Sequence, residues 1–285
     1  MLKNILNTYT SGLSNHINTN VESIDKSIQE LIFNNKLLIK VSYNNSSPII
    51  LNLRCNVKFI YYLDMILKLL NVVDIDNDDN KFKFTINGKY PLNNNYTILT
   101  NFNIHDIFLE DEVNETNLPI INILKAENID NSDTIVSIDQ YDIKNKYRLD
   151  FFESWRQANY IMFKHSKNIL KLNVKDSNDL WTSFFIKNDF ESYINVITKN
   201  NLINLNEKIP VRVVYKTASE EIILRQPSVE TNDTLHNVII EKLEFDMNSK
   251  IIIQGFNIHN FHFTLKNLYQ NFHSPDGFLY IVVVI

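Results

Sequence analysis

Cys55 is the only cysteine in the chain of 285 residues, so it is the only side chain that could form a thioester. A nucleophilic cysteine needs a lowered pKa, and a neighbouring base commonly supplies it. Cys55 lies in Leu53-Arg54-Cys55-Asn56-Val57, at a predicted strand-to-helix junction, with no histidine nearby in sequence. The sequence therefore favours a buried structural thiol. A single cysteine also excludes a disulfide framework and indicates a reducing, cytosolic location.

The seven histidines and four glycines offer no other catalytic pattern. His259 and His262 are the closest histidine pair, but no third zinc ligand accompanies them, so no metal site is expected. Four scattered glycines cannot build a phosphate-binding loop, and no cofactor is expected. His165 falls on the apolar stripe of a predicted helix, where a core residue is a better interpretation than a catalytic base. The sequence predicts a protein that is not an enzyme.

The composition is that of a folded protein with a mildly acidic charge balance. Hydrophobic residues make up 44% of the chain and the formal net charge is −5. Such a charge argues against a nucleic-acid partner. No apolar run approaches the ~20 residues needed to cross a bilayer, and the first residues lack the continuous apolar core of a secretory signal. We expect a soluble, cytoplasmic protein.

The first part of the chain alternates in the manner of strands around one helix. A turn cluster at 44–48 separates the first two strands, and Asn87-Gly88 is a strong hairpin signal after the third. The predicted elements are strands at Leu37–Tyr43 and Ile49–Leu53, a helix at Val57–Leu70, and strands at Lys81–Ile86 and Pro119–Leu124. Two strands, a helix and further strands is the order of a β-grasp fold.

The same order recurs after Pro210. Asp233 or Thr234 is available as the N-cap of the predicted helix, and proline and glycine in Ser274-Pro275-Asp276-Gly277 end the last one. The predicted elements are a hairpin of Val211–Tyr215 and Glu221–Arg225, a helix at Thr234–Leu243, a strand at Lys250–Gln254, a helix at Thr264–Phe272 and a strand at Phe278–Ile285.

A helical block separates these two folds. Apolar residues recur at spacings of three and four, which is typical of one buried helix face. They are Phe151, Trp155, Ala158, Met162, His165 and Ile169. A second helical stretch starts near Ser177, with a break at Asn188-Asp189.

The predicted class is therefore α+β, with two β-grasp folds flanking a helix-rich domain. The expected organisation is an N-terminal extension at 1–26, a first fold with its opening helix at 27–126, a linker at 127–146, a helix-rich domain at 147–206 and a second fold at 207–285.

Several segments resemble the autophagy protein 5 family, most strongly in the last 140 residues. They are Ile209-Pro210-Val211-Arg212-Val213, Gln254-Gly255, Ser274-Pro275-Asp276-Gly277-Phe278-Leu279-Tyr280-Ile281, Asp179-Leu180-Trp181, Asn188-Asp189-Phe190 and, more weakly, Ile28-Gln29-Glu30-Leu31-Ile32-Phe33-Asn34-Asn35. The resemblance implies two ubiquitin-like folds and a non-catalytic scaffold. It also implies binding to the ubiquitin-like modifier autophagy protein 12 and to a helix of autophagy protein 16. Further expectations are transfer of autophagy protein 8 onto lipid, and recruitment to the phagophore or pre-autophagosomal membrane.

The family's modifier-accepting lysine follows an apolar residue and precedes Gln or Glu, and the matching context here is Trp155-Arg156-Gln157. Arg156 cannot form an isopeptide bond, because its guanidinium stays charged and its lone pairs are delocalised. Non-covalent association with the modifier is therefore the first hypothesis. The alternatives are a bond to Lys164 or Lys167, or a shifted alignment.

At ~100° per residue, the basic and aromatic residues after Arg156 would share one solvent-facing side of a continuing helix. They are Tyr160, Phe163, Lys164, Lys167 and Lys171. Such a face would meet the modifier or a membrane headgroup layer, and an ordinary solvated helix face is the alternative. The other functions considered are a thioester enzyme using Cys55 and a ubiquitin-like adaptor with unrelated partners.

Overall fold

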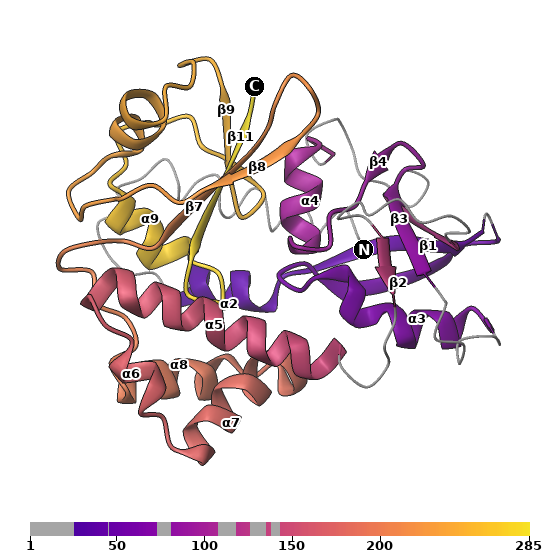
Figure 1. Ribbon diagram of the computed structural model, residues 1–285, viewed down its shortest axis with the longest axis horizontal. Coiled ribbons are helices and arrows are strands. Elements are labelled where there is room, and N and C mark those ends of the chain that lie inside the picture. Colours follow the sequence, from indigo (N-terminus) through magenta and orange to yellow (C-terminus); the bar gives the residue numbers. More distant parts are fainter. Residues whose placement is uncertain (1–25, 45, 73–80, 108–117, 126–134, 138–142) are drawn as a thin grey trace. The chain divides into compact units, whose positions relative to one another are not determined.

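The computed structural model describes residues 26–44, 46–72, 81–107, 118–125, 135–137 and 143–285 (Figure 1). Earlier expectations for the extension at 1–26 and for much of the linker at 127–146 lie outside these residues. The chain divides into two compact units. The first unit is Asn35–Leu149, and the second combines Met1–Asn34 with Asp150–Ile285.

The first unit is built on a mixed sheet with the strand order β2-β1-β5-β3-β4, with β6 also paired to β3. The neighbours β1 and β5 are parallel, and the other pairs are antiparallel. The strands are β1 (Lys36–Tyr43), β2 (Ile49–Arg54), β3 (Lys81–Ile86), β4 (Tyr90–Pro91), β5 (Ile120–Lys125) and β6 (Ile135–Ser137). This arrangement is the predicted β-grasp fold.

The short helices η1 (Phe59–Tyr62) and α3 (Leu63–Leu69) cover the sheet of the first unit. Phe59 meets Phe84 edge to face at 5.3 Å between ring centroids, inside one apolar core. Asn87 and Gly88 both have positive φ angles, as the predicted hairpin turn requires. The strands β4 and β6 and the helix α4 (Ile98–Ile104) were not predicted from the sequence. The cap of α4 was a readable signal, because the Thr97 hydroxyl accepts the Thr100 N–H.

The second unit contains a sheet with the strand order β10-β9-β11-β7-β8. Read from the other edge, β8-β7-β11-β9-β10 matches β2-β1-β5-β3-β4 strand for strand, and β7 and β11 are again parallel. The strands are β7 (Val211–Lys216), β8 (Ile222–Arg225), β9 (Lys250–Ile253), β10 (Phe256–Asn257) and β11 (Leu279–Val284). The α+β class with two β-grasp folds is confirmed.

Two helices complete the second β-grasp fold. The predicted helix at Thr234–Leu243 is mainly a π-helical segment, η3 (Asn237–Lys242), and the Thr234 hydroxyl accepts the Asn237 N–H. Helix α9 (Leu265–Phe272) begins at its cap Thr264, close to the predicted bounds. Both contribute apolar side chains to the core on one side of the sheet.

The helical block starts earlier than predicted, because α5 (Ile143–Phe163) begins within the expected linker. The residues of α5 up to Leu149 belong to the first unit, and the rest of the block belongs to the second. It continues through α6 (Lys167–Leu170), α7 (Val174–Thr182), the π-helical η2 (Ser183–Lys187) and α8 (Phe190–Lys199). The predicted break is confirmed. Asn188 adopts a left-handed conformation with φ 54°, and the Asp189 side chain caps α8 by accepting the Ser192 N–H.

The opening helix α2 (Lys26–Asn34) packs in a different place from the one expected. Ile28 and Ile32 belong to the core beneath the second sheet, and Phe33 packs against Phe184, Phe190 and Tyr193 of the helical block. Grouping this helix with the first fold was therefore wrong. Its apolar face finds its partners more than 150 residues further along the chain.

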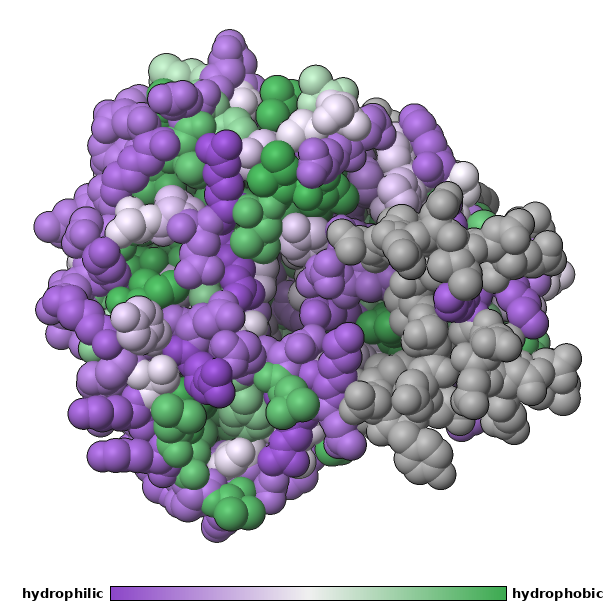
Figure 2. All heavy atoms as spheres, viewed as in Figure 1, coloured by the Kyte–Doolittle hydropathy of each residue, from purple (hydrophilic) through white to green (hydrophobic). Residues whose placement is uncertain are grey.

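Most of the visible surface of the second unit is hydrophilic, with hydrophobic residues scattered over the helical block and over the second sheet (Figure 2). In the helical block, two short helices each expose one large apolar side chain. Leu170 and Val174 are the exposed apolar residues of these two helices. None of the helices in the described residues has the length and apolar character that crossing a bilayer requires.

Candidate interaction site on helix α5

Arg156 lies on the exposed side of α5, opposite the side that is packed in the core. Phe151, Trp155, Ala158 and Met162 are all buried, as the stripe predicted. The Arg156 side chain is 50% exposed, and its Nη2 lies 2.6 Å from Glu153 Oε2, one turn earlier. An intrahelical pair of this kind holds the guanidinium in place while leaving much of its donor fork open to solvent.

The predicted continuous basic face does not form, because α5 ends at Phe163. Lys164 adopts a left-handed conformation with φ 60°, so the chain turns away from the helix axis. Lys167 then begins α6 and Lys171 caps its end. Phe163 is partly buried against the core of the second sheet. Of the predicted face, Arg156 and Tyr160 remain on the open side of α5, and Tyr160 is 63% exposed.

Lys164 is exposed and forms an ion pair, with its Nζ 2.6 Å from Glu207 Oε2. The hydrogen bond to Glu207 and the attraction of that carboxylate raise the pKa of the Lys164 ammonium. A raised pKa lowers the fraction of neutral amine, which is the form that attacks a thioester. Lys167 is also exposed, at the start of α6.

His165 is not on the buried stripe, because it follows the end of α5. It is half-buried and stacks on Phe163 at 5.9 Å between ring centroids. Its Nδ1 accepts the Lys167 N–H at 3.3 Å. The prediction of a core histidine was therefore wrong in position, because it assumed that the helix continued beyond Phe163.

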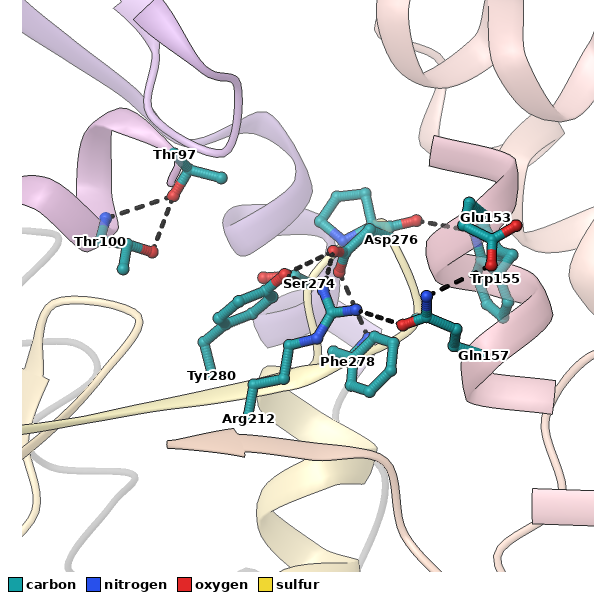
Figure 3. Close-up of polar contacts among 12 residues, drawn as sticks. Thr97, Thr100, Glu153, Trp155, Gln157, Arg212, Ser274, Asp276, Phe278 and Tyr280 are labelled. Carbon is teal, nitrogen blue, oxygen red and sulfur yellow. Dashed lines mark hydrogen bonds and ion pairs between the residues drawn. The ribbon is translucent and has the colours of Figure 1, made fainter. Parts of the chain in front are cut away.

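A polar network links the exposed side of α5 to the second sheet (Figure 3). Gln157 Nε2 donates to Glu153 Oε1 at 3.3 Å, and Gln157 Oε1 accepts from Arg212 Nη2 of β7 at 2.9 Å. Arg212 Nη1 donates to the Tyr280 hydroxyl at 2.7 Å, and that hydroxyl donates to Asp276 Oδ2 at 2.7 Å. The guanidinium also lies 3.7 Å above the Phe278 ring centroid.

The loop Ser274–Gly277 is fixed by hydrogen bonds to its backbone carbonyls. Trp155 Nε1 of α5 and the Tyr193 hydroxyl of α8 both donate to Pro275 O, at 3.0 and 2.7 Å. Gly277 has a φ of 88°, and an added Cβ would lie 3.0 Å from the Trp155 ring. Burial and the nearby Asp276 carboxylate raise the pKa of the Tyr280 hydroxyl, so it stays protonated as a donor.

The loop Ser274–Gly277 could be recognised in the sequence by its resemblance to the family, but the polar network that holds it was not predicted. Arg212, inside an otherwise apolar strand, was the available signal, because a charged residue at such a position needs a partner.

Cys55 is fully buried and donates through Sγ to Asn35 O at 3.3 Å. Burial raises the pKa of the thiol strongly, which is the opposite of what a nucleophile needs. His259 and His262 are exposed. No group of three or more potential metal-ligating side chains occurs in the part of the chain that the structure describes.

Two family models match the helical block and the second β-grasp fold. The model described as "Autophagy protein ATG5, alpha-helical bundle region" matches residues 147–200, and "Autophagy protein ATG5, UblB domain" matches residues 208–283. A crystal structure of Kluyveromyces marxianus Atg5 superposes with a TM-score of 0.72, covering 91% of this chain and all of that chain at 21% identity. That likeness shows the same fold.

Curated relatives named Autophagy protein 5 align with part of the chain. The Kluyveromyces lactis protein is 34% identical over 133 residues, which is 45% of this chain and 47% of the relative. The Saccharomyces cerevisiae protein is 29% identical over 142 residues, which is 47% of each chain. The chain thus spans about half the length of the curated relatives that it matches. Together with the fold, these matches show that the chain belongs to the autophagy protein 5 family.

Proposed function

We propose that this protein is a non-catalytic scaffold of autophagosome formation. Membership of the family supports a role in autophagy. On this proposal the chain binds the ubiquitin-like modifier autophagy protein 12 and a helix of autophagy protein 16. The assembly promotes attachment of autophagy protein 8 to lipid, working in the cytoplasm and at the phagophore or pre-autophagosomal membrane.

We further propose that the modifier is held without a covalent bond, and Arg156 is the observation that carries this step. Arginine stands where the family's acceptor lysine is expected, and it is exposed on a rigid helix beside the exposed Tyr160. Arginine and tyrosine are enriched among the residues that dominate protein interfaces. A guanidinium keeps the positive charge of a lysine at this position but cannot form the isopeptide bond.

A covalent bond to a neighbouring lysine is the competing proposal. The ion pair with Glu207 counts against Lys164, because it stabilises the protonated amine. Lys167 follows the turn that ends α5, on a different helix from Arg156. A thioester enzyme using Cys55 is disfavoured by the burial of that thiol. Replacing Cys55 with Ser should therefore leave function intact.

The test is co-expression of the chain with autophagy protein 12 and its conjugating enzymes, followed by native purification and a denaturing gel. We expect co-elution that separates into two bands, and weaker co-elution for Arg156→Glu. Arg156→Lys is the matched control, because it restores an amine at the same place and should yield a heavier band. A heavier band from the unchanged chain that disappears with Lys164→Arg or Lys167→Arg would overturn the non-covalent proposal.

A further inference from the structure

A polar groove lies between α7 and α8 of the helical block, on residues that the network around Arg156 does not use. It encloses a cavity of about 280 Å³. Its lining is mostly charged and hydrogen-bonding, with a single valine. The lining residues are Lys175, Asp176, Asp179, Thr182, Ser183, Lys187, Ser192, Asn195, Val196 and Lys199.

One charge pair in this groove is already satisfied. Both carboxylate oxygens of Asp176 accept from Lys199 Nζ at 2.9 Å, and Asn173 and Asn200 donate to the same carboxylate. The Asp176 side chain is only 6% exposed. This pair ties the start of α7 to the end of α8, and it fixes the floor of the groove at one end.

The other charges face the groove without an ion pair among the described residues. Lys175 lies at the start of α7 and Lys187 at the end of η2, with Asp179 between them. The two lysines are twelve positions apart along α7 and η2, which corresponds to roughly 15–18 Å. The lining therefore presents positive charge at both ends and one negative charge in the middle.

An exposed aliphatic residue stands next to each of these two lysines. Val174 precedes Lys175 and is 79% exposed, and Ile186 precedes Lys187 and is 67% exposed. Val174 and Ile186 do not line the groove themselves, but exposed apolar side chains close to charged ones are typical of a surface that meets another protein.

We propose that the groove binds an acidic helical segment of another protein. Its two carboxylates would pair with Lys175 and Lys187, apolar neighbours would cover Val174 and Ile186, and a central amine or amide would meet Asp179. A membrane is a poorer fit, because a flat lipid surface does not enter a groove between two helices. Asp179 would also repel anionic headgroups or a nucleic-acid backbone.

The test uses the full chain and a synthetic helical peptide with a Glu-Leu pair at each end, about eleven residues apart, and one Lys midway. Since the native thiol is buried, Asn195→Cys provides a unique reactive position in the groove for a fluorescent label. We expect saturable quenching or enhancement on titration with the peptide, and no response to a peptide in which Glu is replaced by Lys.

The groove variant Lys175→Glu/Lys187→Glu should weaken peptide binding about tenfold or more, because both end charges are reversed. The control Lys36→Glu/Lys83→Glu changes the net charge equally on exposed strand positions of the other unit and should bind as the unchanged chain does. Equal weakening by both variants, or no binding at all, would overturn the proposal.

Flotation with vesicles of phosphatidylcholine and phosphatidylserine tests the remaining alternative, which is that the groove lysines bind a lipid surface. Vesicle binding that only the groove variant abolishes would assign the lysines to a lipid surface and overturn the proposal. Co-elution with autophagy protein 12 should be the same for the groove variant and the control. The two proposals can therefore fail independently.

Discussion

The two β-grasp folds share one strand order but differ in what their sheets are joined to. In the first fold, sheet, η1 and α3 close over an apolar core in which Phe59 and Phe84 are central. In the second, Arg212 of β7 donates hydrogen bonds both to Gln157 of helix α5 and to the Tyr280 hydroxyl of β11. The shared order shows that hydrophobic alternation and turns suffice for the topology. The polar network shows where the sheet of the second fold is hydrogen-bonded to a neighbouring helix.

Removing the indole of Trp155 should have the largest effect, and it should destabilise the second unit while leaving the first unchanged. Trp155 is fully buried and donates to Pro275 O, so Trp155→Ala should lower the free energy of unfolding of the second unit by about 3–5 kcal/mol. Hydrogen exchange read by mass spectrometry should show lost protection in β7, β11 and α8 and unchanged protection in β1 and β5. Phe59→Ala is the reciprocal control. Equal losses in both units would mean that they unfold together.

Replacing either of the two turn glycines, Gly88 or Gly277, with Ala should have a smaller effect, and the two effects can be compared directly. Gly88 has φ 69°, and a Cβ there would lie 3.8 Å from Asn122 Nδ2, whereas at Gly277 it would meet Trp155 at 3.0 Å. Gly88→Ala should cost about 1–2 kcal/mol from backbone strain alone. Gly277→Ala should cost about 3 kcal/mol, because overpacking adds to the strain. Urea unfolding measures both, and equal costs would contradict the contact with Trp155.

Arg212 tests whether the network stabilises the join between β7 and α5. Its side chain is 14% exposed, and Arg212→Met should cost about 2 kcal/mol. The change removes the donor to the Tyr280 hydroxyl and to Gln157 Oε1, and it leaves the Asp276 carboxylate without its ion pair. Arg212→Lys should recover only part of this loss, because an ammonium cannot reproduce the fork that contacts Tyr280 and Gln157 together. Full recovery by lysine in thermal unfolding would show that charge alone matters.

The smallest expected effect is a difference in acid sensitivity between the units. Hydrogen bonds from Lys199, outweighing burial, hold the pKa of Asp176 below its ordinary value of 3.8. The stabilisation is present above pH 3.8 and is lost as the pH falls through the lower folded pKa. Asp176→Asn should remove this dependence. Hydrogen exchange measured at pH 5 and pH 3 should show that α7 and α8 of the unchanged chain lose protection at the lower pH. In the variant, the loss of protection between the two pH values should be smaller.

Local patterns were enough to predict both folds and one helix boundary. Alternating residues predicted strands such as β1 and β7, and Asn188-Asp189 predicted the break before α8, since both residue types favour caps and left-handed turns. The end of α5 could not be predicted in this way, because a lysine at Lys164 carries no preference for the left-handed conformation. Because of that one turn, Lys164, Lys167 and Lys171 do not share the predicted interaction face with Arg156.

The network around Arg212 depends on long-range contacts, which explains why it was missed. Gln157 and Arg212 are 55 positions apart, and Trp155 and Pro275 are 120 apart. No periodicity within a single segment relates such residues. In contrast, the position of Arg156 on an exposed helix face could be predicted from the buried stripe alone. A residue opposite the buried face of a surface helix lies on its exposed face.

The placement of α2 and β11 also has a consequence for synthesis on the ribosome. Helix α2 is made early, yet its core partners in α9 and the helical block come after residue 150. The strand β11 lies between β7 and β9, although it is made after both of them. The first unit can therefore complete its fold during translation while Ile28, Ile32 and Phe33 remain without their partners. A nascent chain stalled before residue 279 should bind chaperones through α2 and β7, with its first sheet already formed.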